Sequence, residues 1–290
     1  MILLADAGST KTTWAILSPG YISTKDADGI NPIQMSKDDI HRRIAPIFDA
    51  DFLKICPDEV HYYGAGVNTT SAPIMQDVLS HFFPSSIIQV YPDIMAVAHA
   101  LSNNQQSLIF IVGTGSASCL WDGQKILSSA PSGGYLLGDE GSGSWLGKQL
   151  LISYMRNEWP KDLQQAFWDT YHLTMDDIIQ QVYSELSPNR YLASFVPFIH
   201  THRQHPDMQQ SIMHSFQMLI SRHLRYYQHQ NMTPLHNTAH FSGSVAYYFQ
   251  NEMRKVCSQQ ISVGYFCKNP MNQLIQYYQQ KWNGLKTQNM

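Results

Sequence analysis

Apolar residues recur along this chain either in short runs or at helical spacing. The order of these two patterns predicts an α/β protein. Short apolar runs that end in small or polar residues predict β-strands over 59–66, 86–92, 238–243 and 260–267. Apolar residues at helical spacing predict helices over 37–50, 94–104, 143–157, 174–186, 190–202, 207–230, 244–257 and 271–283. In the first of these helices Ile40, Ile44 and Ile47 share one face, and Ser36 supplies the N-cap.

Two segments repeat the same pattern. Residues 1–17 and 107–121 each contain an apolar strand, a tight turn of small and hydroxyl-bearing residues, and a second strand. Such a repeat predicts a duplicated α/β domain in which each copy begins with its own β-hairpin. We place the boundary in the polar stretch near residue 105, which gives domains over 1–105 and 106–290. The last helix is expected to pack back on the first domain.

Composition narrows the functional class. The chain has 290 residues, a formal net charge of −3 and 43% hydrophobic residues, which suits a globular protein and gives no basic footprint for nucleic acid. No apolar run approaches the roughly 20 residues of a membrane helix, and the N-terminus lacks a basic signal-peptide region. The four cysteines are dispersed without a CxxC pair, so we expect reduced thiols in a soluble cytoplasmic protein.

The histidine-rich stretch between residues 200 and 229 carries no recognisable metal motif. His200, His202, His205, His214, His223 and His229 show no HExxH or comparable ligand spacing. A solvated helix face is the simpler interpretation of this stretch, and a zinc site is the alternative.

The first hairpin turn, Asp6–Thr12, is suited to phosphate. Gly8 permits a sharp turn, the Ser and Thr residues offer hydroxyls, and Lys11 offers a cation. Asp6 ends a predicted buried strand, where a Mg²⁺ ion held through water would account for its charge. The turn leads into a strand and lacks the GxxxxGK[ST] pattern, so it is not a Walker loop. An ordinary polar hairpin is the competing interpretation.

The second hairpin turn, Gly113–Ser116, is a more specific sign of phosphate binding when it is considered together with the first. It lacks the third glycine of a dinucleotide fingerprint. Two opposed hairpins could hold the β- and γ-phosphates of one nucleotide between two domains. A glycine-rich loop over 133–144 contains five glycines and an acidic pair, which is typical of close backbone approach to a ligand or of a moving lid.

Two further positions lie where a strand meets a helix. Asp93 follows the strand 86–92 and opens the helix 94–104, so it is either a catalytic carboxylate or the N-cap of that helix. The segment 241–246 is an apolar strand that ends in a Gly/Ser turn before a helix, which suits backbone contact with an adenosine moiety.

Together, Asp6-AGSTKT, Asp93, Gly113-TGS, Gly133-GYLLGDEGSGSWLG and Phe241-SGSVA resemble, in order and spacing, the N-acetylglucosamine kinase branch of the BadF/BadG/BcrA/BcrD ATPase family. The resemblance covers nearly the whole chain. It implies the actin-like ATPase fold, which is a duplicated ribonuclease-H-like fold with the active site in a cleft between two domains.

The resemblance also implies a role for each matching residue. Asp93 matches the catalytic base, and Asp6 lies at the metal. The nucleotide-binding residues are Thr10, Lys11, Gly113, Thr114, Gly115, Gly243 and Ser244. The sugar-binding residues are Asn31, Ser116, Gly133, Gly134 and Asp139, although Asp139 could serve the metal instead. The implied cofactors are ATP and Mg²⁺, and the implied partner is a small amino sugar, with a homodimer as the assembly to test.

Two segments depart from the family pattern. Gly64–Asn68 replaces a Ser-Gly-Gly-like turn near the sugar, and His202–Asp207 replaces a small-residue stretch near adenosine. The function we expect is phosphorylation of N-acetylglucosamine or a close relative, with N-acetylmuramic acid and glucosamine still open.

Two other functions compete with the kinase. An activator ATPase of a dehydratase or reductase would need clustered cysteine ligands for iron and sulfur, whereas Cys119 sits in a hairpin strand and the others are scattered. A non-catalytic sugar sensor would need a DNA-binding extension, whereas the catalytic pattern begins at residue 2.

Overall fold

The computed structural model describes residues 1–8, 10–48, 56–232, 238–258 and 260–288. The chain divides into two compact units. The first contains Met1–Asn104 and Pro270–Met290, and the second contains Gln105–Asn269. Each unit is built on its own five-stranded sheet.

The sheet of the first unit combines an antiparallel hairpin with parallel strands. Its strands are β1 (Ile2–Ala7), β2 (Lys11–Ser18), β3 (Tyr21–Asp28), β4 (Glu59–Gly64) and β5 (Ile87–Pro92). They lie in the order β3-β2-β1-β4-β5. β1, β2 and β3 are antiparallel neighbours, while β1, β4 and β5 are parallel. The carboxyl ends of β1, β4 and β5 therefore meet at one edge of the sheet.

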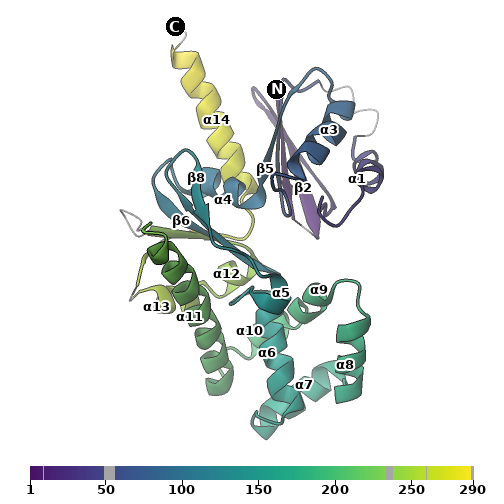
Figure 1. Ribbon diagram of the computed structural model, residues 1–290, viewed down its shortest axis with the longest axis vertical. Coiled ribbons are helices and arrows are strands. Elements are labelled where there is room, and N and C mark those ends of the chain that lie inside the picture. The colour runs from purple at the N-terminus through teal and green to yellow at the C-terminus, as the bar shows by residue number, and fades with distance from the viewer. Residues whose placement is uncertain (9, 49–55, 233–237, 259, 289–290) are drawn as a thin grey trace. The chain divides into compact units, whose positions relative to one another are not determined.

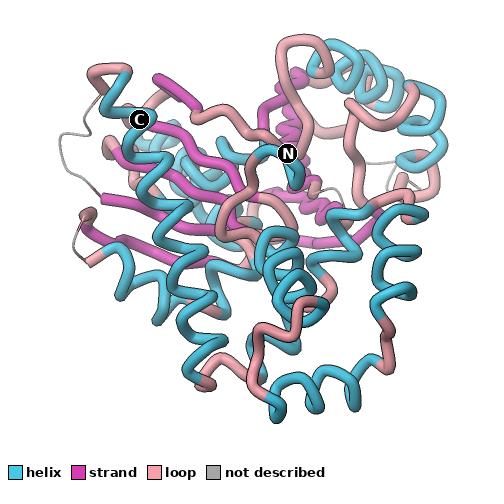
Figure 2. Tube along the Cα trace, turned by 60° about the horizontal axis from the view of Figure 1, so that its bottom comes forward, coloured by secondary structure: helices cyan, strands magenta, loops and turns pink. Residues whose placement is uncertain are grey.

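The sheet of the second unit repeats this arrangement. Its strands are β6 (Ser107–Val112), β7 (Ser116–Trp121), β8 (Ile126–Ser129), β9 (Thr238–Ser242) and β10 (Ser262–Cys267). Their order is β10-β9-β6-β7-β8, with β6, β9 and β10 parallel and β7 and β8 antiparallel. Figure 2 shows the strands of this sheet side by side, with helices beside them. The predicted duplication is thus confirmed.

Helices cover both faces of the first sheet (Figure 1). They are α1 (Lys37–Ile44), α3 (Ala72–Phe82), α4 (Asp93–Leu101) and α14 (Met271–Gln288). Apolar side chains of α1 and α3 pack with Trp14 and Tyr62 on one face. Those of α4 and α14 pack with Leu4 and Tyr63 on the other. The last helix therefore belongs to the first unit, although it is the final segment of the chain.

The second unit is mainly helical outside its sheet. Its helices are α5 (Gly134–Leu137), α6 (Gly143–Met155), α7 (Lys161–Tyr171), α8 (Met175–Ser184), α9 (Pro188–Ala193), α10 (Val196–Thr201), α11 (Pro206–His229), α12 (Ser244–Tyr248) and α13 (Gln250–Cys257). The helix predicted over 190–202 is two helices, because Pro197 cannot donate the backbone hydrogen bond that a continuous helix requires. The helix predicted over 244–257 is also divided, at Phe249.

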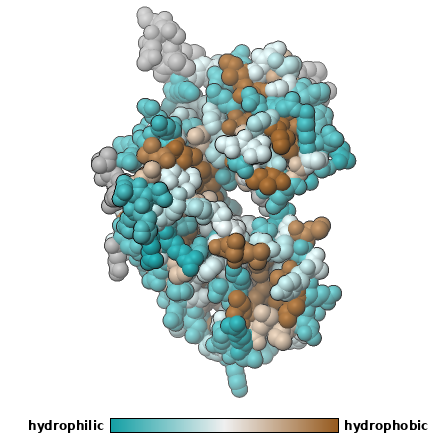
Figure 3. All heavy atoms as spheres, viewed as in Figure 1, coloured by the Kyte–Doolittle hydropathy of each residue, from teal (hydrophilic) through white to brown (hydrophobic). Residues whose placement is uncertain are grey.

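Hydrophilic side chains cover most of the face shown in Figure 3, with separate apolar patches between them. The most exposed large apolar side chains of the second unit are Leu136, Leu137, Tyr183 and Leu186. Among the described residues, every helix is too short or too polar to cross a lipid bilayer.

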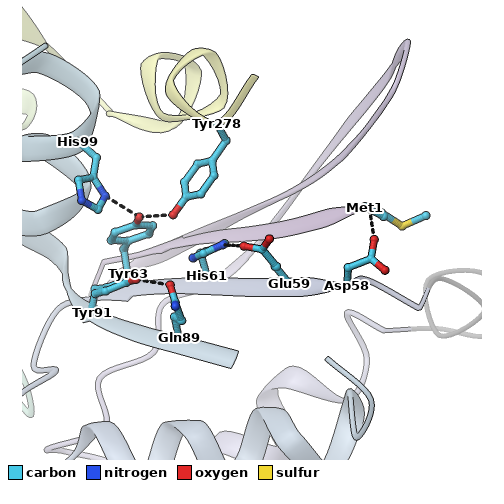
Figure 4. Close-up of polar contacts among 9 residues, drawn as sticks. All are labelled: Met1, Asp58, Glu59, His61, Tyr63, Gln89, Tyr91, His99 and Tyr278. Carbon is cyan, nitrogen blue, oxygen red and sulfur yellow. Dashed lines mark hydrogen bonds and ion pairs between the residues drawn. The ribbon is translucent and has the colours of Figure 1, made fainter. Parts of the chain in front are cut away.

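Hydrogen-bonded aromatic residues attach α14 to the first sheet (Figure 4). The hydroxyl of Tyr63 on β4 lies 2.6 Å from the hydroxyl of Tyr278 and 2.8 Å from Nδ1 of His99. Next to them Nε2 of His61 lies 2.8 Å from a carboxylate oxygen of Glu59. The histidines are thus enclosed between the sheet, α4 and α14.

These enclosed histidines should make the protein sensitive to acid. Burial, followed by the charges of Lys281 and His61, lowers the pKa of His99 to about 4. Because an unfolded histidine takes up its proton near pH 6.5, the stabilisation is complete above that pH and is lost as pH falls toward 4. We expect His99 to contribute about 2–3 kcal/mol to the loss in free energy of unfolding between pH 7 and 4.5, in addition to the contributions of His223 and His240, whose pKa values burial also lowers to about 4. His99→Gln should flatten this dependence, whereas His229→Gln, at an exposed helix end, should not.

Candidate functional site

Two carboxylates lie at the carboxyl edge of the first sheet. Asp6 is the next-to-last residue of β1, and Asp93 directly follows β5. Because β1, β4 and β5 are parallel, both residues come to the same edge, where open α/β sheets commonly bind ligands. Both residues are half-buried.

The surroundings of these carboxylates disfavour charge. Burial, and then the negative charge of Asp93, raise the pKa of Asp6 to about 7. Burial also raises the pKa of Asp93, opposed by backbone N–H groups of Ile94 and of Asp93 itself. Close to both lies Tyr62, whose buried hydroxyl has no hydrogen-bond partner and whose pKa is raised by burial and by the two carboxylates. A cation would relieve this concentration of negative charge.

This edge is suited to Mg²⁺. The ion takes oxygen ligands and is commonly held by one or two carboxylates together with water and substrate phosphates. Asp6 provides one such carboxylate, and Asp93 lies close enough to interact with it. Clusters of three or more His, Cys, Asp or Glu residues with metal-binding geometry are absent from the described parts of the chain.

Asp93 is not the N-cap of α4. Pro92 occupies the cap position, and Asp93 is the first helical residue. The Asp93 carboxylate accepts a hydrogen bond from the backbone N–H of Ile94 at 2.8 Å. The N-cap alternative raised by the sequence is therefore wrong. A negative charge in the first turn still interacts favourably with the helix dipole.

The first hairpin turn forms at the same edge. The backbone N–H of Gly8 donates to the carbonyl of Lys11 at 2.9 Å, which closes the turn, and Thr10 is exposed. The ammonium of Lys11 lies 2.8 Å from the carboxylate of Asp26, with both side chains more than half exposed. Ser9 lies outside the described residues.

Asn31 packs against the turn that follows β4. A Cβ atom at Gly66 would lie 2.2 Å from Oδ1 of Asn31, so only glycine leaves room for this amide. The backbone of Gly66 also has φ +76°, which glycine adopts readily. The departure from the family pattern at Gly64–Asn68 thus preserves a glycine where Asn31 approaches the backbone.

The second hairpin turn is held by the start of α6. The backbone N–H of Gly113 donates to the carbonyl of Gly115 at 2.9 Å. The carbonyls of Gly113 and Thr114 accept from the N–H groups of Gly143 at 2.8 Å and Ser144 at 3.0 Å. The turn between β6 and β7 is therefore fixed by contacts across the glycine-rich loop.

Asp139 reaches this hairpin from the glycine-rich loop. Its Oδ1 accepts the backbone N–H of Ser116 at 3.1 Å. A Cβ atom at Gly115 would come within 2.9 Å of its Oδ2. Burial raises the pKa of the Asp139 carboxyl, while the N–H of Ser116 opposes the shift.

Gly133 and Gly134 form the base of the same loop. Backbone hydrogen bonds join Leu137 to Gly133 at 3.3 Å and Gly138 to Gly134 at 2.8 Å, which closes the single turn of α5. The ammonium of Lys148 on α6 donates to the carbonyl of Tyr135 at 2.9 Å. The two glycines are thus hydrogen-bonded to the two residues directly before Asp139.

Gly243 and Ser244 lie beside the second hairpin. Gly243 has φ +108°, and a Cβ atom there would lie 2.4 Å from the carbonyl oxygen of Val112. Its N–H donates to the carbonyl of Cys267 at 3.1 Å. The segment His202–Asp207 contains the connection from α10 to α11 and the first two residues of α11.

The predicted site residues therefore fall into two groups at the equivalent edge of each sheet. In the first unit the structure places Asp6, Thr10, Lys11, Asn31 and Asp93 around the ends of β1, β4 and β5. In the second unit it places Gly113, Thr114, Gly115, Ser116, Gly133, Gly134, Asp139, Gly243 and Ser244 around the ends of β6 and β9.

Sequence reasoning missed the polar residues of α11 that support the second group. His223 is buried, and its Nδ1 lies 2.5 Å from Oγ of Ser118, which also lies 2.7 Å from the hydroxyl of Tyr227. The interpretation of the histidine-rich stretch as a solvated face is thus wrong for His223. Its position between Ile220 and Tyr227, on the apolar side of the helix, is the signal that could have revealed it.

No family model and no curated protein matches the chain. Solved structures do. A candidate N-acetylglucosamine kinase from Porphyromonas gingivalis is 34% identical with a TM-score of 0.88, and the match covers 96% of this chain and 98% of that one. A second candidate N-acetylglucosamine kinase, from Chromobacterium violaceum, is 15% identical with a TM-score of 0.70. That match covers 95% of this chain and 98% of the other. A ROK family glucokinase from Streptomyces griseus, in complex with glucose and AMPPNP, is 13% identical with a TM-score of 0.59. This match covers 95% of this chain and 97% of the glucokinase.

These matches agree with the strand order of the two sheets. The two more distant structures show the fold alone, and they confirm the predicted actin-like arrangement of two mixed five-stranded sheets. The Porphyromonas gingivalis protein shares the fold and about a third of its residues over nearly its entire length.

Proposed function

Because the chain belongs to the actin-like sugar kinase superfamily, in one family with the Porphyromonas gingivalis protein, we propose that it phosphorylates an amino sugar with ATP. The observation that carries this proposal is the pair Asp6 and Asp93 at the carboxyl edge of the first sheet. N-acetylglucosamine is the substrate we propose first, since both candidate kinases are named for it.

The two hairpin turns would bind the phosphates of ATP. Thr10 and Lys11 belong to the first turn, and Gly113, Thr114 and Gly115 to the second. The N–H of Gly113 is already donated to the carbonyl of Gly115, so the other backbone N–H groups of these turns are the ones that can be directed at phosphate oxygens. Gly243 and Ser244, next to the second turn, would contact the adenosine by their backbone.

Asp93 would act as the general base. The attacking sugar oxygen forms its bond to the γ-phosphorus while the bond from that phosphorus to the bridging oxygen of ADP breaks. The proton of the sugar hydroxyl passes to the Asp93 carboxylate. Phosphoryl transfer depends mainly on positioning and charge neutralisation, so a single well-placed base is enough side-chain chemistry.

Asp6, with Asp93 nearby, would hold Mg²⁺, which when bound supplies positive charge for the phosphates. The sugar itself would be bound by Asn31 in the first unit and by Ser116, Gly133, Gly134 and Asp139 in the second. Asn31 and Asp139 offer hydrogen-bonding oxygens that the contacts to Gly66 and Ser116 already orient.

A coupled assay for ADP release across a panel of sugars tests the proposal. The panel should contain N-acetylglucosamine, N-acetylmuramic acid, glucosamine and glucose, each with ATP and Mg²⁺. We expect one N-acetylated sugar to be preferred, with a phosphorylated product visible by mass spectrometry. Release of ADP at the same rate without any sugar would overturn the proposal in favour of an ATPase.

A further inference from the structure

The turn that carries Asp139 has a backbone conformation that must be maintained by its surroundings. Asp139 has φ +59°, in the left-handed region that residues with side chains rarely adopt, and Gly141 follows with φ +72°. Such a conformation persists only where neighbouring contacts determine it. The turn receives these contacts from two sides.

The first side is strand β7. Ser116 donates its backbone N–H to the Asp139 carboxylate at 3.1 Å and its hydroxyl to the carbonyl of Glu140 at 3.0 Å. One residue of the strand therefore donates hydrogen bonds to two successive residues of the turn.

The second side is helix α11. A Cβ atom at Gly141 would lie 3.0 Å from Cβ of Leu219, so this helix directly supports the turn. Three residues further along α11, the guanidinium of Arg222 forms an ion pair with the carboxylate of Glu140. The Glu140 side chain is only 7% exposed and that of Arg222 is 53% exposed. A buried carboxylate needs such a partner, since an unpaired buried charge is strongly unfavourable.

We propose that Arg222 is a positioning residue for the sugar site. The ion pair of Arg222 with Glu140 fixes the turn, and the fixed turn directs the Asp139 carboxylate toward Ser116. The identity of the bound sugar rests on the proposed function, whereas the order of the turn does not. No local sequence motif marks Arg222, because its partner Glu140 is 82 residues away in the chain.

The test compares Arg222→Gln and Arg222→Lys with Arg225→Gln, which alters another exposed arginine of the same helix. In Arg222→Gln we expect the KM for the sugar to rise about tenfold to a hundredfold, because a small misplacement of a binding group has effects of this size. The kcat at saturating sugar and the KM for ATP should change less than about threefold. Arg222→Lys should recover part of the loss, and Arg225→Gln should match the wild type.

Hydrogen exchange of residues 133–145 supplies a measurement that needs no activity. Exchange there should be faster in Arg222→Gln than in Arg225→Gln by more than the difference in their melting temperatures explains. If exchange rises but no sugar supports turnover in the wild type, the positioning role holds and the proposed function fails. A lower melting temperature with unchanged exchange and unchanged sugar KM would reduce Arg222 to a structural residue and overturn the proposal.

Discussion

Asp93→Asn should lower kcat by about 10²- to 10⁴-fold while both substrates still bind, which is the usual size of general-base assistance. The amide has the shape of the carboxylate and can still accept the hydrogen bond that Ile94 donates at 2.8 Å. It cannot accept a proton from the sugar hydroxyl. Burial already raises the pKa of Asp93, so replacement by a neutral group should not reduce stability. The measurements are kcat, calorimetric affinity for ATP and sugar, and the melting temperature.

Asp176→Asn provides the matched control. Asp176 is an exposed carboxylate in the first turn of α8, as Asp93 is a carboxylate in the first turn of α4. Both changes remove a charge that interacts with a helix dipole, which is worth less than about 1 kcal/mol at an exposed position. A fall in kcat that is confined to Asp93→Asn therefore reports catalysis. Near-normal turnover in this variant would remove Asp93 from the catalytic role.

The parts of the fold that the sequence predicted are those that local patterns determine. The two hairpins were predictable because apolar strands and small turn residues lie next to each other in the chain, and their strands are buried. β3 and β8 were missed because the alternation of apolar side chains along these two strands is weak. α3 was also missed, although Met75, Val78 and Leu79 on its buried face follow helical spacing.

Within the candidate site the same distinction holds. Asp6 was conspicuous because it lies near the end of a strand whose other residues are mostly buried, whereas Asp93 was singled out from a helix cap only by the family resemblance. The support of the turn that carries Asp139 could not be found in this way, since it depends on contacts such as that of Arg222 with Glu140, which are 82 residues apart. A helical pattern shows which residues share a face of α11, but not what that face contacts.

A single methyl group at Gly115 should impair sugar binding, whereas the same addition at Gly113 should not. A Cβ atom at Gly115 would lie 2.9 Å and 3.1 Å from the two carboxylate oxygens of Asp139, so that side chain must move away from Ser116. At Gly113 a Cβ atom would meet no heavy atom within 4 Å. The KM for the sugar should therefore rise about tenfold to a hundredfold in Gly115→Ala and remain near the wild-type value in Gly113→Ala, since a lost hydrogen bond to a charged group costs about 1.5–3 kcal/mol.

The larger variant Gly115→Val extends this experiment to the nucleotide. A β-branched side chain is stiff and would occupy the space that a phosphate needs in the second hairpin turn, so calorimetry should detect no ATP binding while the fold persists. Gly115→Ala thus tests the role of the turn in sugar binding, and Gly115→Val tests its role in ATP binding. Unchanged ATP affinity in Gly115→Val would remove the second hairpin from the phosphate site, and an unchanged sugar KM in Gly115→Ala would show that the orientation of Asp139 does not control sugar binding.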